Sequence, residues 1–315
     1  MTILVSDYCS PNTGQDVAPA IQAAVNALPK NDVLVFDKPG KYDLADTVEF
    51  RDKVFCRIEG GRAWLRSLPG VAKKTMLRFL GCGDTSVADL RIQSTHGAKC
   101  VISQGRSSTR GSGRMTFERL SLSGDCELAT VYSCCAEITA WRDCYILTQN
   151  AEPAYLDARF DVGEEGFVES SNVQKVFDHC TLSSKGPLAA DKAVIRIYGG
   201  LEDFYLVNAC YVGTGGRGVV IDCTRPDGVG ARINSLTLSG VRVEGRDVTI
   251  DQSGSRLIRY DMNQPLSGLA VRSVRYAVDG QPAPAAAIEI VDGGLSGFEE
   301  LLFDTGDVPH LLDQT

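Results

Sequence analysis

The sequence predicts an all-β fold, a parallel β-helix in which the chain winds into a solenoid of stacked strands. One short pattern returns seven times: a bulky apolar residue, two variable residues, a smaller apolar residue or cysteine, one variable residue, then an aliphatic or aromatic residue. The end of each copy alternates between apolar and variable residues, which is typical of a strand with one buried face. The central residues of the copies lie 30, 24, 36, 30, 31 and 33 positions apart, and such a recurrence indicates a stack of similar units. These central residues are Leu90, Leu120, Cys144, Cys180, Cys210, Val241 and Val274.

Residues 1–45 are expected to form an N-terminal cap over the open end of the solenoid, because an unpaired strand edge recruits other chains. Asp16 is the expected N-cap of a short helix whose apolar residues follow at helical spacing. Pro19 falls in the first turn, where its missing N–H costs no hydrogen bond. A strand at 33–36 and a turn at 38–42 then lead into the solenoid.

This opening resembles the start of pectate-lyase-superfamily β-helix proteins. The resemblance rests on Asp7-Tyr8, the loop at 13–16, the Ala-rich helix at 20–25, the strand at 33–36 and the turn Pro39-Gly40-Lys41-Tyr42. It covers about the first 60 residues and implies that the parallel β-helix is right-handed. The superfamily includes lyases, hydrolases, epimerases and phage tailspikes, so the resemblance implies no single activity.

The solenoid itself is expected to span residues 46–278, beginning with a weaker copy of the pattern at Cys56-Arg57-Ile58. A second apolar run follows most copies, and Gly, Ser, Asn and Asp between the runs favour tight turns. Residues 279–315 are expected to cap the far end or to mediate oligomer contacts, since the Pro-rich segment 281–284 interrupts the repeat.

Composition limits the partners and the compartment. A net charge of −8 argues against a nucleic-acid partner, and no run of 18 apolar residues predicts membrane insertion. The first residues do not form a basic segment followed by a long apolar one, so no secretion signal is expected. The 11 cysteines form no metal-binding pattern, so we expect no metal and no cofactor. Reduced, buried cysteines without a leader predict folding in the cytoplasm of a host cell.

The residue between the last two core positions of each copy is expected to point outward. These residues are Arg91, Ser121, Tyr145, Thr181, Tyr211, Arg242 and Arg275. Tyr145 and Tyr211 are two rungs apart, roughly 10 Å, which suits platforms for successive sugar rings. The alternative is that tyrosine is simply common in strands. We predict that Tyr145, Thr181, Tyr211 and Arg142 bind substrate if a carbohydrate groove exists.

Charged residues form two columns at the turn just before these strands. One column holds Glu118, Arg142, Asp178 and Asn208, and the other holds Asp89, Arg119, Asp143 and His179. A surface ladder of weak ion pairs is one interpretation. The other is that Asp143, Asp178 and His179 support proton transfer or sugar binding.

The longest interval, between Cys144 and Cys180, contains an acidic insertion of the kind that forms binding surfaces on solenoids. Its candidate residues are Asp157, Asp161, Glu164 and Glu165. Two carboxylates held apart across a groove are what glycoside hydrolysis requires. The alternatives for the same residues are a solvated acidic loop and a calcium site. The arginine-rich segment 106–114 is expected to be a flexible surface loop, with anion or polysaccharide contact as the alternative.

These features favour a phage virion protein of the tailspike or fibre type that binds bacterial surface polysaccharide. Phage parts fold inside the bacterium and leave by lysis, which fits a chain without a visible leader. The resemblance further implies a homotrimer and contacts with other virion proteins. Two alternatives stay open: a polysaccharide lyase, hydrolase or epimerase, and a purely structural or decoration protein of a virion. The motifs of polygalacturonase-like hydrolases are absent from the sequence, so the sequence leaves catalysis undecided.

Overall fold

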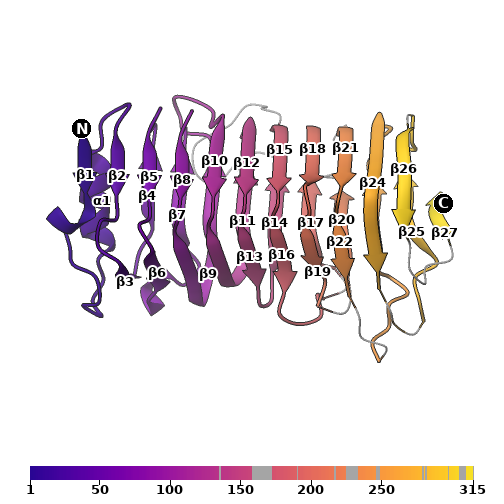
Figure 1. Ribbon diagram of the computed structural model, residues 1–315, viewed down its shortest axis with the longest axis horizontal. Helices are drawn as coiled ribbons and strands as arrows, with labels where there is room; N and C mark the ends of the chain where they lie inside the picture. The colour runs from indigo at the N-terminus through magenta and orange to yellow at the C-terminus, as the bar shows by residue number, and fades with distance from the viewer. Residues whose placement is uncertain are drawn as a thin grey trace.

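The computed structural model is an elongated stack of parallel strands, with the N-terminus and the single labelled helix at one end and the C-terminus at the other (Figure 1). It describes residues 1–134, 136–157, 172–189, 191–215, 218–224, 233–245, 249–278, 280, 282–296, 298–304 and 310–314. The side chains of 172, 298–304 and 314 lie outside this description.

The N-terminal end is closed by a helix, as the sequence predicts. Strand β1 (Thr2–Leu4) and a 3-10 turn (Val5–Asp7) precede α1 (Ala18–Ala27). The predicted N-cap is one residue off, because the N-cap of α1 is Val17, which makes no side-chain hydrogen bond. Asp16 Oδ1 accepts the N–H of Ala18 at 3.0 Å and that of Ala45 at 2.9 Å, so its carboxylate joins the first residue of α1 to the segment that follows Leu44. The apolar face of α1 is buried against the first rungs.

The strands form three parallel ladders along the solenoid. The first ladder runs through β1, β2 (Val33–Val35), β5 (Arg57–Glu59), β8 (Ser86–Ala88), β10 (Met115–Glu118), β12 (Ile138–Arg142), β15 (Asn172–Asp178), β18 (Leu201–Val207), β21 (Ile233–Ser239), β24 (Gly268–Ala277) and β26 (Phe298–Asp304). The second runs through β3 (Gly40–Leu44), β6 (Ala63–Ser67), β9 (Arg91–Gly105), β11 (Ser121–Cys134), β13 (Tyr145–Thr148), β16 (Thr181–Ser184), β19 (Tyr211–Gly213), β22 (Arg242–Glu244) and the end of β24.

The third ladder runs through β4 (Val48–Arg51), β7 (Thr75–Leu80), the ends of β9 and β11, β14 (Glu152–Asp157), β17 (Ala193–Tyr198), β20 (Val219–Thr224), β23 (Arg256–Asp261), β25 (Ala286–Asp292) and β27 (His310–Gln314). A 3-10 turn at Pro69–Val71 precedes β7. The long strands β9 and β11 each contribute to the second and third ladders.

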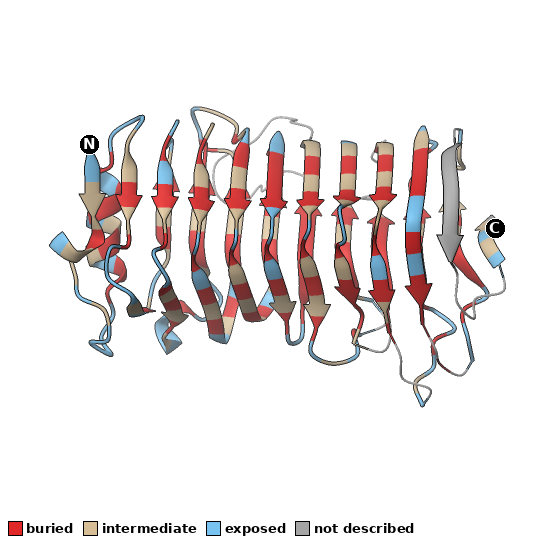
Figure 2. Cartoon of the chain, in the orientation of Figure 1, coloured by how far each residue is buried: buried red, intermediate tan, exposed pale blue. Residues whose placement is uncertain are grey.

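The repeated pattern lies where the first ladder turns into the second, and its central residues form one inward column. All seven, from Leu90 to Val274, are at most 2% exposed. The residue after each is hydrogen-bonded to the preceding rung; for example, the N–H of Thr181 donates to Cys144 O at 2.9 Å. The predicted inward ladder is therefore confirmed. Buried and less buried residues alternate along the strands accordingly (Figure 2).

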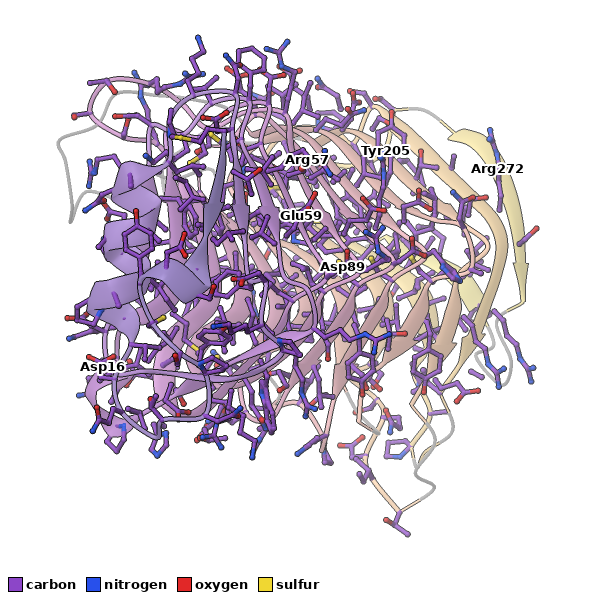
Figure 3. All side chains as sticks on the ribbon, turned by 60° about the vertical axis from the view of Figure 1, so that its left-hand side comes forward. Asp16, Arg57, Glu59, Asp89, Tyr205 and Arg272 are labelled. Carbon is purple, nitrogen blue, oxygen red and sulfur yellow. The ribbon has the colours of Figure 1, made fainter. Side chains whose placement is uncertain are left out.

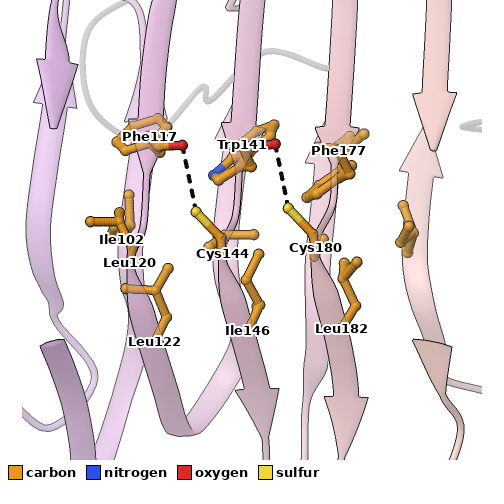
Figure 4. Close-up of a cluster of buried hydrophobic side chains, with 14 of the residues drawn as sticks. Ile102, Phe117, Leu120, Leu122, Trp141, Cys144, Ile146, Phe177, Cys180 and Leu182 are labelled. Atoms are coloured by element: carbon orange, nitrogen blue, oxygen red, sulfur yellow. Dashed lines mark hydrogen bonds between the residues drawn. The ribbon is translucent and has the colours of Figure 1, made fainter. Parts of the chain in front are cut away.

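Cysteine suits three of these positions because a thiol is small, apolar and a weak donor. Cys144 Sγ lies 3.5 Å from Phe117 O, and Cys180 Sγ lies 3.4 Å from Trp141 O (Figure 4). Cys210 Sγ lies 3.4 Å from Phe177 O in the same way. Each thiol thus donates to a carbonyl of the rung before it. Every described cysteine is free of a disulfide, and all but Cys9 are buried.

Aromatic side chains stack beside the thiol column through the middle of the core. Trp141 lies between Phe117 and Phe177, with ring centroids 5.7 and 4.6 Å apart and nearly parallel planes. Phe79, on β7 of the third ladder, meets Phe117 edge to face, with ring centroids 5.6 Å apart. Parallel register produces this stack, because it places the same strand position of successive rungs about 4.8 Å apart.

One residue in the left-handed region makes four successive turns from the first ladder to the second. Asp89, Arg119, Asp143 and His179 occupy this position, with φ between 51° and 59°, whereas the turn after Val207 has two such residues, Asn208 and Ala209. Their N–H groups donate to a carbonyl of the following rung; that of Asp143 reaches Asp178 O at 3.0 Å. The backbone therefore aims a column of polar side chains outward at this corner.

The ladders continue past Val278. Strands β25 and β27 extend the third ladder and β26 the first, so residues beyond the Pro-rich interruption add further parallel pairs. A role of this segment in oligomer contacts stays a prediction. Within the part of the chain that is described, no helix has the length and apolar character needed to span a membrane.

Replacing Trp141 by alanine should remove the centre of the aromatic stack and lower the free energy of unfolding by about 3–5 kcal/mol. Urea denaturation followed by circular dichroism measures this loss. Tyr145→Ala is the control, since Tyr145 lies four residues further along the same rung and is 45% exposed, and it should change stability by about 0.5 kcal/mol or less. Equal losses in both variants would contradict the inward assignment of Trp141.

Candidate functional site

The outward stripe predicted for sugar binding is in register. Tyr145 pairs with Thr181, and Thr181 pairs with Tyr211, on β13, β16 and β19. Tyr145 is 45% exposed, while Thr181 and Tyr211 are half-buried. Tyr211 Oη lies 3.4 Å from Glu244 Oε2, and burial followed by the nearby Glu244 carboxylate raises the Tyr211 pKa. Their role in binding stays a prediction.

The turn column brings some of the predicted catalytic residues together. His179 Nδ1 lies 2.6 Å from Asp143 Oδ1, and both side chains are at least half exposed. Asp178 does not complete this pair, since its Oδ1 accepts from Asn208 Nδ2 at 2.8 Å in the neighbouring column. Arg142 is in register with Asp178. Asp143 and His179 lie together at the surface, and their role in proton transfer or sugar binding stays a prediction.

Figure 3 labels residues from two outward files of side chains on the first ladder and one residue of the turn column. Arg57 and Tyr205 belong to one outward file of the first ladder, and Glu59 and Arg272 to the file beside it, with Asp89 at the turn that follows. The side chains of these files point away from the core along most of the solenoid.

The loop candidates divide between the third ladder and a segment outside the described residues. Asp157 ends β14 on the third ladder, where it is 3% exposed and accepts a hydrogen bond from Tyr132 Oη at 3.2 Å. Asp161, Glu164 and Glu165 lie outside the described residues. Asp157 therefore belongs to a different face from the Tyr145 stripe.

The structure reveals a cluster on the outward face of the third ladder that sequence analysis missed. Three tyrosines lie on the consecutive rungs β11, β14 and β17. The rings of Tyr132 and Tyr155 have centroids 5.7 Å apart, and those of Tyr155 and Tyr198 are 6.5 Å apart. Tyr155 is 7% exposed, between the half-buried Tyr132 and Tyr198. Together with Glu152, Arg196 and Asp222 we call these residues the third-ladder cluster.

Arg196 joins two carboxylates from different rungs of this cluster. Its Nε donates to Glu152 Oε1 at 2.6 Å, and its Nη1 donates to Asp222 Oδ2 at 2.8 Å. Glu152 also accepts the N–H of Ala193 at 3.2 Å. Glu152 is 2% and Asp222 6% exposed, so the guanidinium supplies the charge compensation that burial requires.

The charges continue toward the C-terminus in an alternating file. Arg259 lies in register between Asp222 and Glu289, with its Nη1 3.5 Å from Asp222 Oδ1 and its Nε 3.8 Å from Glu289 Oε2. Arg259 and Asp261 are each about one-third exposed and contact each other at 3.3 Å. Arg259 and Asp261, next to the cluster, therefore present hydrogen-bond donors and acceptors to solvent.

Burial raises the pKa of Glu152 and of Asp222, and the neighbouring arginines only partly oppose it. Burial works against a charged Arg196, yet the attraction of Glu152 and Asp222 outweighs it and raises the pKa of Arg196. Both carboxylates are anchored by the arginine, so the cluster is built to hold fixed hydrogen-bonding groups beside aromatic rings. Within the described residues, no group of three His, Cys, Asp or Glu side chains is arranged to hold a metal ion.

A signal for this face was present in the second apolar run of each repeat. Its inward residues Val131, Ala154 and Ile195 are in register, so the residues after them form an outward file. The file reads Ser103, Tyr132, Tyr155, Arg196, Asp222, Arg259 and Glu289. The spacing between the two runs differs from rung to rung, which conceals this file in the sequence.

Several solved structures are similar to the whole chain. A variant of the tailspike protein of E. coli bacteriophage HK620, in complex with a hexasaccharide, matches with a TM-score of 0.59 and 10% identity; the match covers 100% of this chain and 63% of the tailspike. This chain is a right-handed parallel β-helix. The endo-xylogalacturonan hydrolase from Aspergillus tubingensis matches at 0.53 and 10% identity over 100% of this chain and 95% of the hydrolase.

A surface protein and adhesin of Streptococcus pneumoniae, PfbA, matches with a TM-score of 0.53 and 10% identity over the full length of both chains. Identities this low establish the fold alone. No family model matches the sequence, and neither does any curated protein.

Replacing Arg196 by methionine should leave Glu152 and Asp222 buried without their shared partner and cost about 3–5 kcal/mol of stability near neutral pH. The folded-state pKa values of both carboxyls, already raised, should rise further above their unfolded values of about 4. The folded variant then binds protons more tightly than the unfolded chain, so the loss shrinks as the pH falls toward about 4.

Urea denaturation at about pH 7.5 and about pH 5 measures this difference. The control is Arg242→Met, since Arg242 is 60% exposed and pairs with Glu244 on the surface. A loss for Arg196→Met that is independent of pH would contradict the buried carboxylate assignment.

Proposed function

We propose that this protein binds bacterial surface polysaccharide as a phage virion component of the tailspike or fibre type. The observation that carries this proposal is the third-ladder cluster, in which three tyrosines on consecutive rungs lie beside anchored carboxylates and an arginine. Aromatic rings pack against the apolar faces of sugars, while carboxylates accept from hydroxyl groups and guanidinium groups donate to them.

The geometry suits an extended polymer better than a small molecule. The rungs repeat about every 4.8 Å along the solenoid axis, so the cluster and the charged file beyond it offer similar contacts over several rungs. Tyr132 and Tyr198 are partly accessible, as are Arg259 and Asp261. A chain of sugars running along the axis would meet the tyrosines first and the charged file next.

Two further observations support a virion setting. The tailspike neighbour shares the fold and was determined with a hexasaccharide, and an adhesin shares it too. The described cysteines are all free, which suits folding in a reducing compartment such as the cytoplasm of an infected bacterium. A homotrimer and contacts with other virion proteins belong to the same proposal.

A second candidate function is a polysaccharide lyase, hydrolase or epimerase. It is favoured by the raised pKa of Glu152 and Asp222 and by the surface pair of Asp143 and His179. It predicts release of reducing ends or unsaturated sugars from a bound polysaccharide, which binding alone does not.

Replacing Tyr132 and Tyr198 together by alanine should weaken binding to bacterial surface polysaccharide at least about tenfold, because two aromatic contacts are lost. Binding to purified capsule and O-antigen preparations, measured by surface plasmon resonance, tests this. The matched control is Tyr145→Ala with Tyr211→Ala on the second ladder.

A loss confined to that control pair would move the site to the stripe predicted from the sequence. Unchanged binding in both double variants would reject aromatic recognition. A wild-type protein that binds none of the preparations would favour a purely structural role.

A further inference from the structure

A polar cavity of about 330 Å³ lies at the corner where the third ladder turns into the first, away from the third-ladder cluster. It is formed where segment 106–114, between β9 and β10, meets the turns of the rungs on either side. Its lining is Gly83, Asp84, Arg110, Gly111, Gly113, Arg114 and Glu137. No part of the proposed polysaccharide surface uses these residues.

Two glycines keep this cavity open. Gly83 and Gly113 are bridged as neighbours on adjacent rungs. A Cβ atom on Gly83 would lie 2.7 Å from Arg110 Nη2, and one on Gly113 would lie 2.7 Å from Glu137 Oε2. Arg110 and Glu137 therefore lie over adjacent rungs, and the missing side chains make room for their head groups.

The Arg110 side chain enters this cavity from a loop whose backbone is hydrogen-bonded. The loop backbone is fixed locally, since the N–H of Ser107 donates to Arg110 O at 2.9 Å and the N–H of Arg110 donates to Ser107 Oγ at 3.2 Å. Arg110 Nε is buried and has no hydrogen-bond partner within the described chain. Arg114 in the same loop differs, because its Nη2 pairs with Asp84 Oδ2 at 2.7 Å and its side chain is 66% exposed.

Glu137 is positioned by its backbone on the next rung. Its N–H donates to Ser112 O at 2.9 Å, and its carbonyl accepts from the fully buried Lys175 Nζ at 2.6 Å. Its carboxylate shares the cavity with Arg110 without forming an ion pair with it. The Arg110 guanidinium and the carboxylate of the exposed Glu137 thus face the same space, and a buried donor left unsatisfied there is costly.

The charge balance of the lining indicates which ligand fits. Two arginines and two carboxylates leave no net charge in the cavity. A free anion would gain from Arg110 but meet Glu137 and Asp84, whereas a hydroxyl group both accepts and donates. Adjacent hydroxyls of one sugar can accept from Arg110 and donate to Glu137 at once.

We propose that this corner cavity is a binding site for one neutral, hydroxyl-rich sugar unit, held between Arg110 and Glu137. The inference rests on the proposed function, because it supplies a second contact point for a bound polysaccharide. It also assigns the sugar chemistry: a unit without a carboxylate or phosphate group at this position.

The test compares Arg110→Met, Glu137→Met and the double variant with the control Arg242→Met, a 60% exposed arginine on the second ladder that lies outside the cavity. The probes are neutral dextran and galactan oligosaccharides, polygalacturonate oligosaccharides, and inorganic sulfate. Isothermal titration measures affinity, and hydrogen exchange of the peptides around 105–114 and 136–142 locates the contact. Thermal unfolding of each variant shows whether it is folded.

We expect a neutral oligosaccharide to protect both peptides, with affinity falling at least about tenfold in Arg110→Met and no more than about twofold in Arg242→Met. The double variant should lose little more than the larger single loss, because one sugar unit bridges both side chains. Additive losses would overturn the bridging geometry.

Other outcomes overturn the proposal while leaving the proposed function standing. Tighter binding of sulfate or polygalacturonate than of neutral sugars, dependent on Arg110, would make the cavity an anion site. Neutral sugars that bind with wild-type affinity to Arg110→Met but not to the Tyr132 and Tyr198 double variant would leave the third-ladder cluster as the sugar site. Absence of binding by any probe and by the surface polysaccharides would overturn both.

Discussion

Residue-by-residue stacking of parallel rungs is the constraint on which the rest of this molecule depends. Parallel strands pair each position with its counterpart one rung away, about 4.8 Å along the axis. Each inward side chain therefore packs against the side chains at the same position of the two neighbouring rungs. Trp141 between Phe117 and Phe177, and Cys180 between Cys144 and Cys210, show how closely the core follows this rule.

The same stacking orders the surface. Outward positions form files along the axis, as where Tyr132 and Tyr155 are followed by Arg196, Asp222 and Arg259, whose charges alternate from rung to rung. Neighbours in a file interact because the backbone has already placed them side by side. This explains how a buried carboxylate such as Glu152 can be retained: the next rung supplies Arg196 at hydrogen-bonding distance.

Corners differ from ladders because the turns need not match in length. The turn at Asp143 and His179 is a single left-handed residue, so its column stays in register and brings their side chains to 2.6 Å. The corner after the third ladder varies instead, and segment 106–114 there leaves the space between Arg110 and Glu137. In this molecule the corner cavity therefore lies where the turns of successive rungs differ in length. The extended outward files lie where successive rungs match.

The sequence by itself determined the solenoid, the inward column from Leu90 to Val274 and the outward register of Tyr145, Thr181 and Tyr211. These features depend on contacts within one short strand and its turn, and an alternating pattern records them directly. It also placed the start of the helix within one residue, since the N-cap is Val17 rather than Asp16. Only the tertiary structure decided that Asp157 lies on another face from Tyr145, that Arg196 joins Glu152 to Asp222, and that Arg110 faces Glu137. Those pairs come from different rungs at sequence separations that vary with the turns between them, so their proximity depends on how each turn closes.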